Sequence, residues 1–366
     1  MLKLFLILIL SIVFFVNYRN GEEADDNTKA MGKRSTSKLI HAVEQAEGAG
    51  ARVRRSVGTM NNRKFNPFLL LDHFSVSSDA GFPQHGHSGQ ETITLVLKGA
   101  MAHEDFTGSK GILYPGDLQF MTAGKGVVHS EMPVQLEDSS EKTMTEGIQL
   151  WVDLPKALRE TKPRYRDLRS WEIPEVSTAD GKVNVKVISG KSYGVESAKD
   201  LAYTPVQYYY VTIQPNGTYT QKVPTDYNFF LYVLNGQKAV VNDDTYVPKH
   251  HTLFFEEDGD EVEVTNQGSD EIELVLVGGE VLKQESVQYG PFVADSEAHI
   301  KKKFMDYQYA KNGFEQVRTW ESLISAGVTA DMVDELGGNL EERKETERKH
   351  LEEKAKRSEG SVRDEL

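Results

Sequence analysis

The sequence predicts an all-β protein made of two β-rich halves. Residues 91–124 alternate apolar and polar side chains between turn residues such as Gly99 and Pro115, which is typical of antiparallel strands joined by tight turns. Residues 166–295 repeat this style in short apolar strands separated by Gly, Asn and Asp. A chain of 366 residues with 39% apolar residues is long enough for about two domains, each with an ordinary core.

The composition excludes several classes of protein. The chain has no cysteine, so disulfides, thiolate ligands, iron–sulfur clusters and cysteine nucleophiles are excluded, and His, Asp and Glu remain as metal donors. The net charge of −14 argues against a nucleic-acid partner, because phosphate binding requires a basic surface that releases counterions.

Residues 1–20 are predicted to be a signal peptide. Lys3 precedes an apolar run at 4–16, which is short for a membrane span but has the length of a signal-peptide core. The cleavage site is not a clean A-x-A pattern, so retention as an uncleaved anchor stays open. Residues 21–34 are polar and without period, which predicts a disordered linker.

Four potential metal ligands stand in two pairs with a spacing of two residues. His85 and His87 form one pair, and His129 and Glu131 form the other. Because side chains alternate faces along a strand, each pair projects from one face, and two neighbouring strands can offer four donors to one point. An isolated HxH is as often a pair of ordinary strand residues, but a second pair on a second strand predicts a site for a divalent transition metal.

Three segments resemble the pirin family of the cupin superfamily: NPFLLLDHF at 66–74, AGFPQHGHSGQETITLVLKGA at 80–100 and YPGDLQFMTAGKGVVHSEMP at 114–133. Residues 290–320 are similar to the end of animal and plant pirins. The resemblance implies two stacked cupin barrels, of the jelly-roll or double-stranded β-helix kind, with a C-terminal helical extension.

The resemblance places the family's non-haem Fe(II) on His85, His87, His129 and Glu131, with another divalent transition metal left open. Glu91, the carboxylate that the general cupin pattern would use, is then expected to support the ligands from behind. Two further departures are Thr122, which replaces a cupin proline, and His73, which stands where many pirins carry an acidic residue.

The domain organisation follows from these patterns. His250 and His251 are adjacent and point to opposite faces of a strand, so the second barrel is expected to lack metal ligands. Thr329 and Asn339 can each cap a short helix, the second highly charged and reaching about Arg357, and this region is predicted to be a solvated stalk, with a partner-binding helix as the alternative. The expected parts are a metal-binding barrel at 35–155, a second barrel at 166–295, a packing helix at 296–320 and a charged helical extension at 321–366.

The two ends of the chain predict one compartment. The last residues, Arg363 to Leu366, read RDEL, a variant of the endoplasmic reticulum retrieval signal, which has meaning only on a chain that enters the secretory pathway. With the leader, it predicts the endoplasmic reticulum lumen and a retrieval receptor as partner. Asn216-Gly217-Thr218 is a glycosylation sequon, which is meaningful only in that compartment.

The resemblance also implies an activity. Pirins include members with quercetin 2,3-dioxygenase activity, in which a flavonol hydroxyl is deprotonated, binds the metal and reacts with O₂, and the ring opens with loss of carbon monoxide. On this interpretation Glu131 is both ligand and catalytic base, and the partners are a small aromatic or enolic substrate and O₂. The alternative is an iron-binding interaction or regulatory protein without turnover, so enzymatic activity stays open. A monomer is one option for the oligomeric state.

Neighbouring residues have two interpretations each. Phe82, Phe120 and Met132 are candidates for lining an apolar pocket, with packing in the core as the commoner role. The sequence His103-Glu104-Asp105 is expected to form a turn on the rim, with a supporting role at the metal as the alternative.

Overall fold

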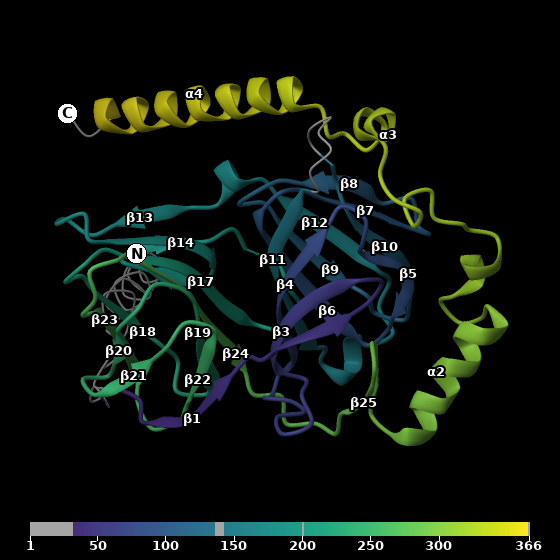
Figure 1. Cartoon of the computed structure of the whole chain (residues 1–366), viewed down its shortest axis with the longest axis horizontal. Coiled ribbons are helices and arrows are strands. Elements are labelled where there is room, and N and C mark those ends of the chain that lie inside the picture. The colour runs from purple at the N-terminus through teal and green to yellow at the C-terminus, as the bar shows by residue number, and fades with distance from the viewer. Residues whose placement is uncertain (1–31, 136–142, 200, 365–366) are drawn as a thin grey trace, which may run out of the picture. The chain divides into compact units, whose positions relative to one another are not determined.

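The structure, a computed structural model, describes residues 32–135, 143–199 and 201–364, and it confirms the predicted all-β class with two barrels (Figure 1). Each barrel pairs a seven-stranded sheet with a four-stranded sheet. The predicted leader and the last two residues of RDEL lie outside the described residues. Among the residues described, no helix is both long and apolar enough to span a membrane.

The first barrel has the sheet orders β12-β9-β6-β11-β4-β3-β2 and β5-β10-β7-β8. Every strand pair in it is antiparallel. The strand bounds are β2 Glu44–Glu47, β3 Ala51–Val57, β4 Phe68–Ser77, β5 Phe82–His87, β6 Gln90–Lys98, β7 Met101–Asp105, β8 Lys110–Leu113, β9 Leu118–Thr122, β10 Val127–Pro133, β11 Met144–Asp153 and β12 Arg164–Leu168.

The second barrel repeats the design with the orders β1-β22-β19-β24-β17-β14-β13 and β18-β23-β20-β21. Its interior is filled with buried apolar side chains, mostly Val, Leu, Phe and Tyr. The strand bounds are β1 Thr36–His41, β13 Glu175–Ser177, β14 Val183–Ser189, β17 Val206–Ile213, β18 Thr218–Lys222, β19 Tyr227–Asn235, β20 Ala239–Val241, β21 Thr245–Val247, β22 His251–Phe255, β23 Glu261–Asn266 and β24 Ile272–Glu280.

The remaining elements are short ribbons and helices. The ribbons are β15 Lys191–Ser192 with β16 Val195–Glu196, and β25 Val287–Tyr289 with β26 Phe292–Ala294. The helices are η1 Lys156–Leu158, η2 Ser170–Glu172, α2 Glu297–Tyr309, η3 Glu315–Arg318, α3 Ala330–Glu335 and α4 Leu340–Asp364.

Two strands lie in the barrel opposite to the one expected from their position in the chain. β1, expected in the first barrel, pairs with β22 of the second, with Leu39 opposite Leu253. β12, which spans the expected start of the second barrel, pairs with β9 of the first, with Arg166 opposite Phe120. Each exchanged strand covers an edge of a seven-stranded sheet, and such an edge would otherwise expose unpaired backbone groups.

The two barrels pack against each other through the outer faces of their seven-stranded sheets. Along β11, Ile148, Leu150 and Val152 are fully buried in one hydrophobic cluster with second-barrel residues such as Tyr208 and Phe230. The intervening residues of β11 face the interior of the first barrel, because side chains alternate along a strand. The apolar alternation in β11 therefore forms the domain interface and leaves the opposite face free for a site.

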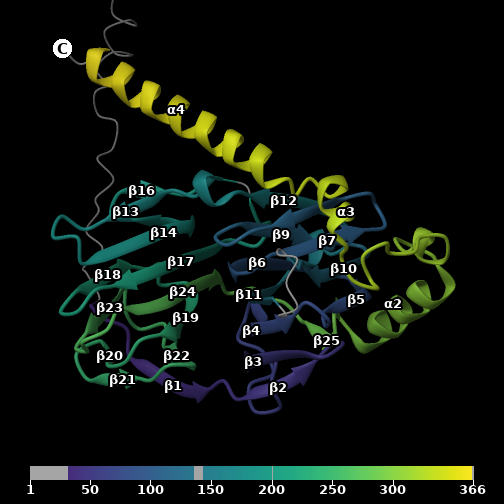
Figure 2. The same cartoon turned by 45° about the horizontal axis from the view of Figure 1, so that its top comes forward.

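The chain between α2 and α4 wraps along the first barrel. We call residues 321–343 the strap. Figure 2 shows this yellow-green segment beside β5 and β10. Arg343 forms a two-bond ion pair with Asp117, at 2.7 and 2.8 Å, and stacks over Tyr114 and Trp171. The prediction of a solvated stalk is therefore wrong for the strap, since Asp117 is fully buried beneath it.

The helix that follows the strap begins where the sequence indicated. Asn339 Oδ1 accepts hydrogen bonds from the backbone N–H groups of Glu341 and Glu342, at 3.0 and 3.1 Å, which is an N-cap. Thr329 occupies the N-cap position of α3 but makes no side-chain capping bond. α4 continues to Asp364, beyond the expected end near Arg357, and its side chains are mostly exposed through Lys356.

Candidate metal centre

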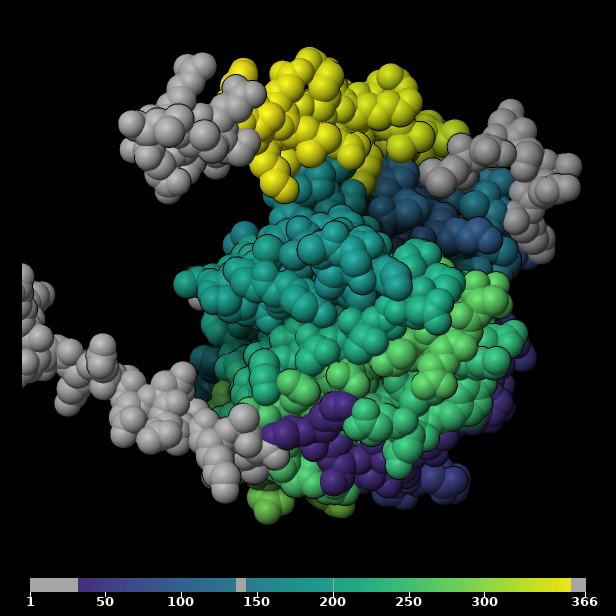
Figure 3. All heavy atoms as spheres, turned by 90° about the vertical axis from the view of Figure 1, so that its left-hand side faces the viewer, coloured from purple at the N-terminus to yellow at the C-terminus, as the bar shows by residue number. Residues whose placement is uncertain are grey.

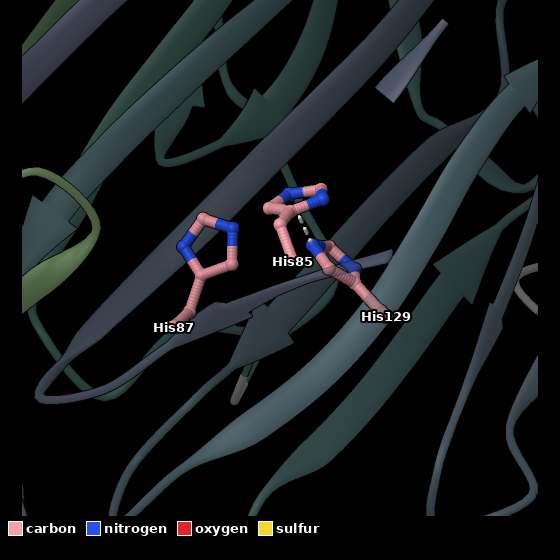
Figure 4. A group of neighbouring side chains, drawn as sticks. All are labelled: His85, His87 and His129. Atoms are coloured by element: carbon pink, nitrogen blue, oxygen red, sulfur yellow. Dashed lines mark hydrogen bonds between the residues drawn. The ribbon is translucent and has the colours of Figure 1, made fainter. Parts of the chain in front are cut away.

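Three histidine side chains converge inside the first barrel (Figure 4). β5 supplies His85 and His87, and the antiparallel neighbour β10 supplies His129, which lies directly opposite His85. One nitrogen from each ring lies within 4.8 Å of the others, and His129 Nε2 is 3.0 Å from His85 Nε2. Among the described residues this is the one such group of three or more His, Cys, Asp or Glu.

Glu131 lies beside the three rings. A register shift between His129 and Glu131 places Glu131 opposite Phe82, and its Oε2 is 4.0 Å from His129 Nε2. Gln149 Nε2 is 3.5 Å from both carboxylate oxygens. The structure thus brings all four predicted ligands to one place, with the carboxylate slightly apart from the histidine cluster.

The electrostatics of these groups suit a divalent cation. Burial lowers the pKa of His85, and it lowers the pKa values of His87 and His129 well below 6.5, so all three rings are neutral donors. Burial raises the pKa of Glu131 to about 7, against the opposing influence of His103 and Gln149. A buried carboxylate among neutral rings lacks a compensating charge, which a bound cation would supply.

Residues outside the cluster orient two of the rings. His85 Nδ1 is 2.8 Å from the carbonyl of Pro83, and donating there leaves Nε2 free for a metal. His87 Nδ1 is 2.8 Å from Gln90 Nε2, and Gln90 Oε1 has no partner among the described residues. A half-turn of this amide would let Oε1 accept from Nδ1–H and so free His87 Nε2, in exchange for the hydrogen bond that Gln90 Nε2 donates to the carbonyl of Pro291. The residues present therefore fit a divalent metal.

A cavity of about 510 Å³ opens above the histidines. Leu70, Phe74, Phe82 and Met101 form an apolar wall. The polar part of the wall is contributed by Thr94, Gln149 and Trp151. The indole Nε1 of Trp151 has no partner among the described residues, and its ring lies edge-on to His87 with centroids 5.1 Å apart.

Charged residues surround the mouth of this cavity. Arg55 donates to both oxygens of Asp72, at 2.7 and 2.6 Å, and to Glu47 at 2.6 Å, so its charge is neutralised within the wall. Arg63 also lines the cavity but is exposed. His73 does not line it, because it follows Asp72 in β4 and points to the opposite face, toward Tyr232 of the second barrel. The residue at position 73 therefore does not set the charge at the mouth of the cavity.

The expectation for Glu91 is wrong, and the three apolar candidates divide between the two roles considered for them. Glu91 does not support the ligands. Its carboxylate accepts hydrogen bonds from Thr122 Oγ1 at 2.6 Å and from the backbone N–H groups of Tyr203 and Thr204 at 3.0 Å. It therefore joins the segment that leads into β17 of the second barrel to β9 of the first. Of the three apolar pocket candidates, Phe82 lines the cavity, whereas the other two belong to buried core clusters; they are Phe120 and Met132.

The sequence His103-Glu104-Asp105 is not a turn on the rim. It ends the buried strand β7, with His103 opposite Glu131 in β10 and its Nε2 3.2 Å from Asp167 Oδ2. Sequence reasoning also missed Gln149 and Trp151. The alternation of β11 could have found them, since it assigns both to the face opposite the apolar residues.

Comparison with known proteins adds family information. The sequence family described as Pirin matches residues 50–152, and the one described as Pirin C-terminal cupin domain matches residues 208–313. A pirin-like protein of Solanum lycopersicum is 42% identical over 290 residues, which cover 79% of this chain and 96% of that protein. The pirin of Homo sapiens is 42% identical over 284 residues, covering 77% and 94%.

A solved structure of similar fold carries an enzyme name. A quercetin 2,3-dioxygenase from Acinetobacter baumannii aligns with a TM-score of 0.70 at 25% identity, covering 77% of this chain and 99% of that one. The similarity therefore extends over both barrels rather than over a single domain.

Proposed function

Because this chain belongs to the pirin family, we propose that it is a metal-dependent dioxygenase that cleaves quercetin-type flavonols or related enolic substrates with O₂, using Fe(II). One observation carries the proposal. Three neutral imidazoles cluster beside a cavity of about 510 Å³ that His85, His87 and the buried carboxylate of Glu131 line, and its one apolar wall and its size suit a small aromatic molecule. The similarity to a quercetin 2,3-dioxygenase supports the reaction class.

Each residue of the site has a separate role in this proposal. His85, His87, His129 and Glu131 would hold the ion, which supplies a Lewis-acid position for a substrate oxygen and an electron source for O₂. Glu131 Oε2 lies 4.0 Å from His129 Nε2, so this carboxylate can reach both the ion and an enolic hydroxyl bound beside it, whose proton it would accept. Gln149, at 3.5 Å from both oxygens of this carboxylate, orients it.

The test of activity uses iron-loaded protein and quercetin. We expect O₂ uptake with release of an equimolar amount of carbon monoxide. Glu131→Gln keeps an oxygen donor of similar size but removes the charge and the basicity, so turnover should fall by at least about 100-fold, the lower end for a general base, while bound iron falls less. His129→Ala should lose the metal itself.

The opposite outcome is equally clear. If iron-loaded wild-type protein takes up no O₂ with a panel of flavonols and catechols, the dioxygenase proposal fails. Tight iron binding in such a protein would favour the alternative, an iron-binding interaction protein without turnover.

We also propose that the protein resides in the endoplasmic reticulum lumen, where a retrieval receptor binds RDEL. The apolar leader and the RDEL sequence support this location independently. Deleting Asp364 to Leu366 should send the protein into the medium of expressing cells. Finding the tagged full-length chain in the cytosol or nucleus would contradict the proposal.

A further inference from the structure

We propose that Asn216 carries an N-linked glycan, at the end of the second barrel remote from the metal centre. The inference rests on the proposed lumenal location and not on the proposed chemistry. The whole sequence contains one N-x-S/T sequon with a residue other than proline in the middle, and this is Asn216-Gly217-Thr218. A glycan would therefore be attached at a single position.

The structure displays this sequon on an exposed turn. Asn216 lies between β17 and β18, and both Asn216 and Thr218 are exposed. The side-chain amide of Asn216 makes no hydrogen bond to any described residue, so its Nδ2 is available. Figure 3 looks onto the second barrel, whose teal and green residues form the surface on this side. A large polar substituent at such a turn projects into solvent and displaces no packed group.

The backbone of the turn is fixed while the side chain stays free. Asn216 has φ of +59°, a left-handed conformation that Asn tolerates better than most residues. Its N–H donates to the Asn266 carbonyl at 3.0 Å, and the Gly217 N–H donates to the Gln214 carbonyl at 2.9 Å. A Cβ at Gly217 would lie 2.9 Å from the carbonyl oxygens of Gln214 and Lys182, so the middle position requires glycine. The backbone of the turn is therefore fixed, and Asn216 is exposed on it.

The chemistry requires a co-reactant of the lumen, a lipid-pyrophosphate-linked oligosaccharide. Asn216 Nδ2 forms a bond to the anomeric carbon of the first sugar, the bond from that carbon to the pyrophosphate oxygen breaks, and the amide loses one proton. No oxidation or reduction occurs. Thr218 supplies the hydroxyl that the sequon requires, and its Oγ1, 3.0 Å from Thr265 Oγ1, remains on the exposed face.

The experiment expresses the full-length chain with its leader in eukaryotic cells and treats the product with peptide N-glycosidase. We expect one step of increased mobility and, by mass spectrometry, conversion of Asn216 to Asp. Asn216→Gln and Thr218→Ala should each abolish the step, whereas the matched variant Thr218→Ser keeps a hydroxyl and should retain it.

Protection of the chain from added protease, in microsomes prepared from the same cells, reports its location independently. A protected chain without any glycosidase-sensitive step overturns the inference and leaves the lumenal proposal standing. An unprotected chain overturns both. Iron content and O₂ uptake of Asn216→Gln should equal those of the wild type, because no residue of the turn contributes to the cavity.

Discussion

Gln90 shows how a single side chain outside the donor set can control a metal site. Its amide contacts His87 Nδ1 at 2.8 Å and the carbonyl of Pro291 at 3.0 Å, which fixes the orientation of the ring. Partners of this kind typically contribute about 10- to 100-fold to metal affinity. Gln90→Ala should therefore weaken metal binding within that range, as measured by competition with a chelator. The control is Gln288→Ala, which changes a half-buried residue that lines the cavity, and an equal loss in both variants would contradict the prediction.

At this scale the sequence predicted which four side chains come together, but not the residues that contact and orient them. The spacing of His85, His87, His129 and Glu131 depends only on the alternation of a strand, which is local. Gln90 comes near His87 through the tight turn that joins β5 to β6, which the spacing of the donors does not reveal. The alternation of β11 indicates the face on which Gln149 lies, but not that this face meets Glu131. Glu91 was assigned the wrong role for the same reason, since its partners at 203–204 lie 112 and 113 residues later in the chain.

Among the elements, the strap contacts the strands that carry the histidines. Ser325 Oγ accepts from the N–H of Gln84 at 3.0 Å and bonds Ser130 Oγ at 2.7 Å. Gln84 is adjacent to His85, and Ser130 stands between His129 and Glu131. Ser322 Oγ and the N–H of Ile324 donate to Glu104 Oε1 in the neighbouring strand, at 2.7 and 3.1 Å. The strap thus links β5, β7 and β10 at the level of the site.

Ser325→Ala should accelerate metal release. The variant removes two hydrogen bonds, each worth about 1 kcal/mol, so dissociation should quicken several-fold, as measured by transfer of the ion to a chromogenic chelator. Ser296→Ala is the matched control: it removes the N-cap of α2, at a comparable cost of about 1 kcal/mol, without touching these strands. If the control releases the ion as fast as Ser325→Ala, general destabilisation explains the effect and the linking role is wrong.

The strap could not be predicted because its evidence is not periodic. The residues that bind it to the barrel are scattered and polar, and their partners lie far away in the chain. Ser325, for example, bonds Ser130, which lies 195 residues earlier. The exposed part of α4, in contrast, follows from its charged sequence alone. Strands were likewise predictable from alternation, but the exchange of β1 and β12 between barrels was not, since pairing partners are non-local.

For the whole molecule, a histidine pair spans the interface between the barrels. His73 Nδ1 of the first barrel lies 3.0 Å from the hydroxyl of Tyr232, which lies 3.2 Å from His250 Nδ1. Burial is the main cause that lowers the pKa of His73 to about 4 and that of His250 to about 4. The positive charges of Arg54 and Lys249 act in the same direction.

The pair should make stability depend on pH. The unfolded chain protonates these histidines near pH 6.5, whereas the folded chain resists protonation until about pH 4, so the folded state binds fewer protons between these values. The stability is fully present above about pH 6.5 and falls as the pH drops toward 4. His73→Asn keeps a polar group near Tyr232 but does not titrate. Its urea midpoint should fall less than that of the wild type between pH 7 and pH 5; identical changes would refute the coupling.

The exchange of β1 has a consequence for biosynthesis. Residues 36–41 emerge from the ribosome before either barrel, yet their partner strand is β22, at 251–255. The first barrel can fold as soon as its own strands are made, because domains generally fold as units with the N-terminal one first. The second barrel cannot complete its seven-stranded sheet until β1, which was synthesised first, pairs with β22. Until then the backbone groups of β1 have no pairing partner and are exposed to other chains. The nascent chain therefore needs chaperones most during synthesis of its second half.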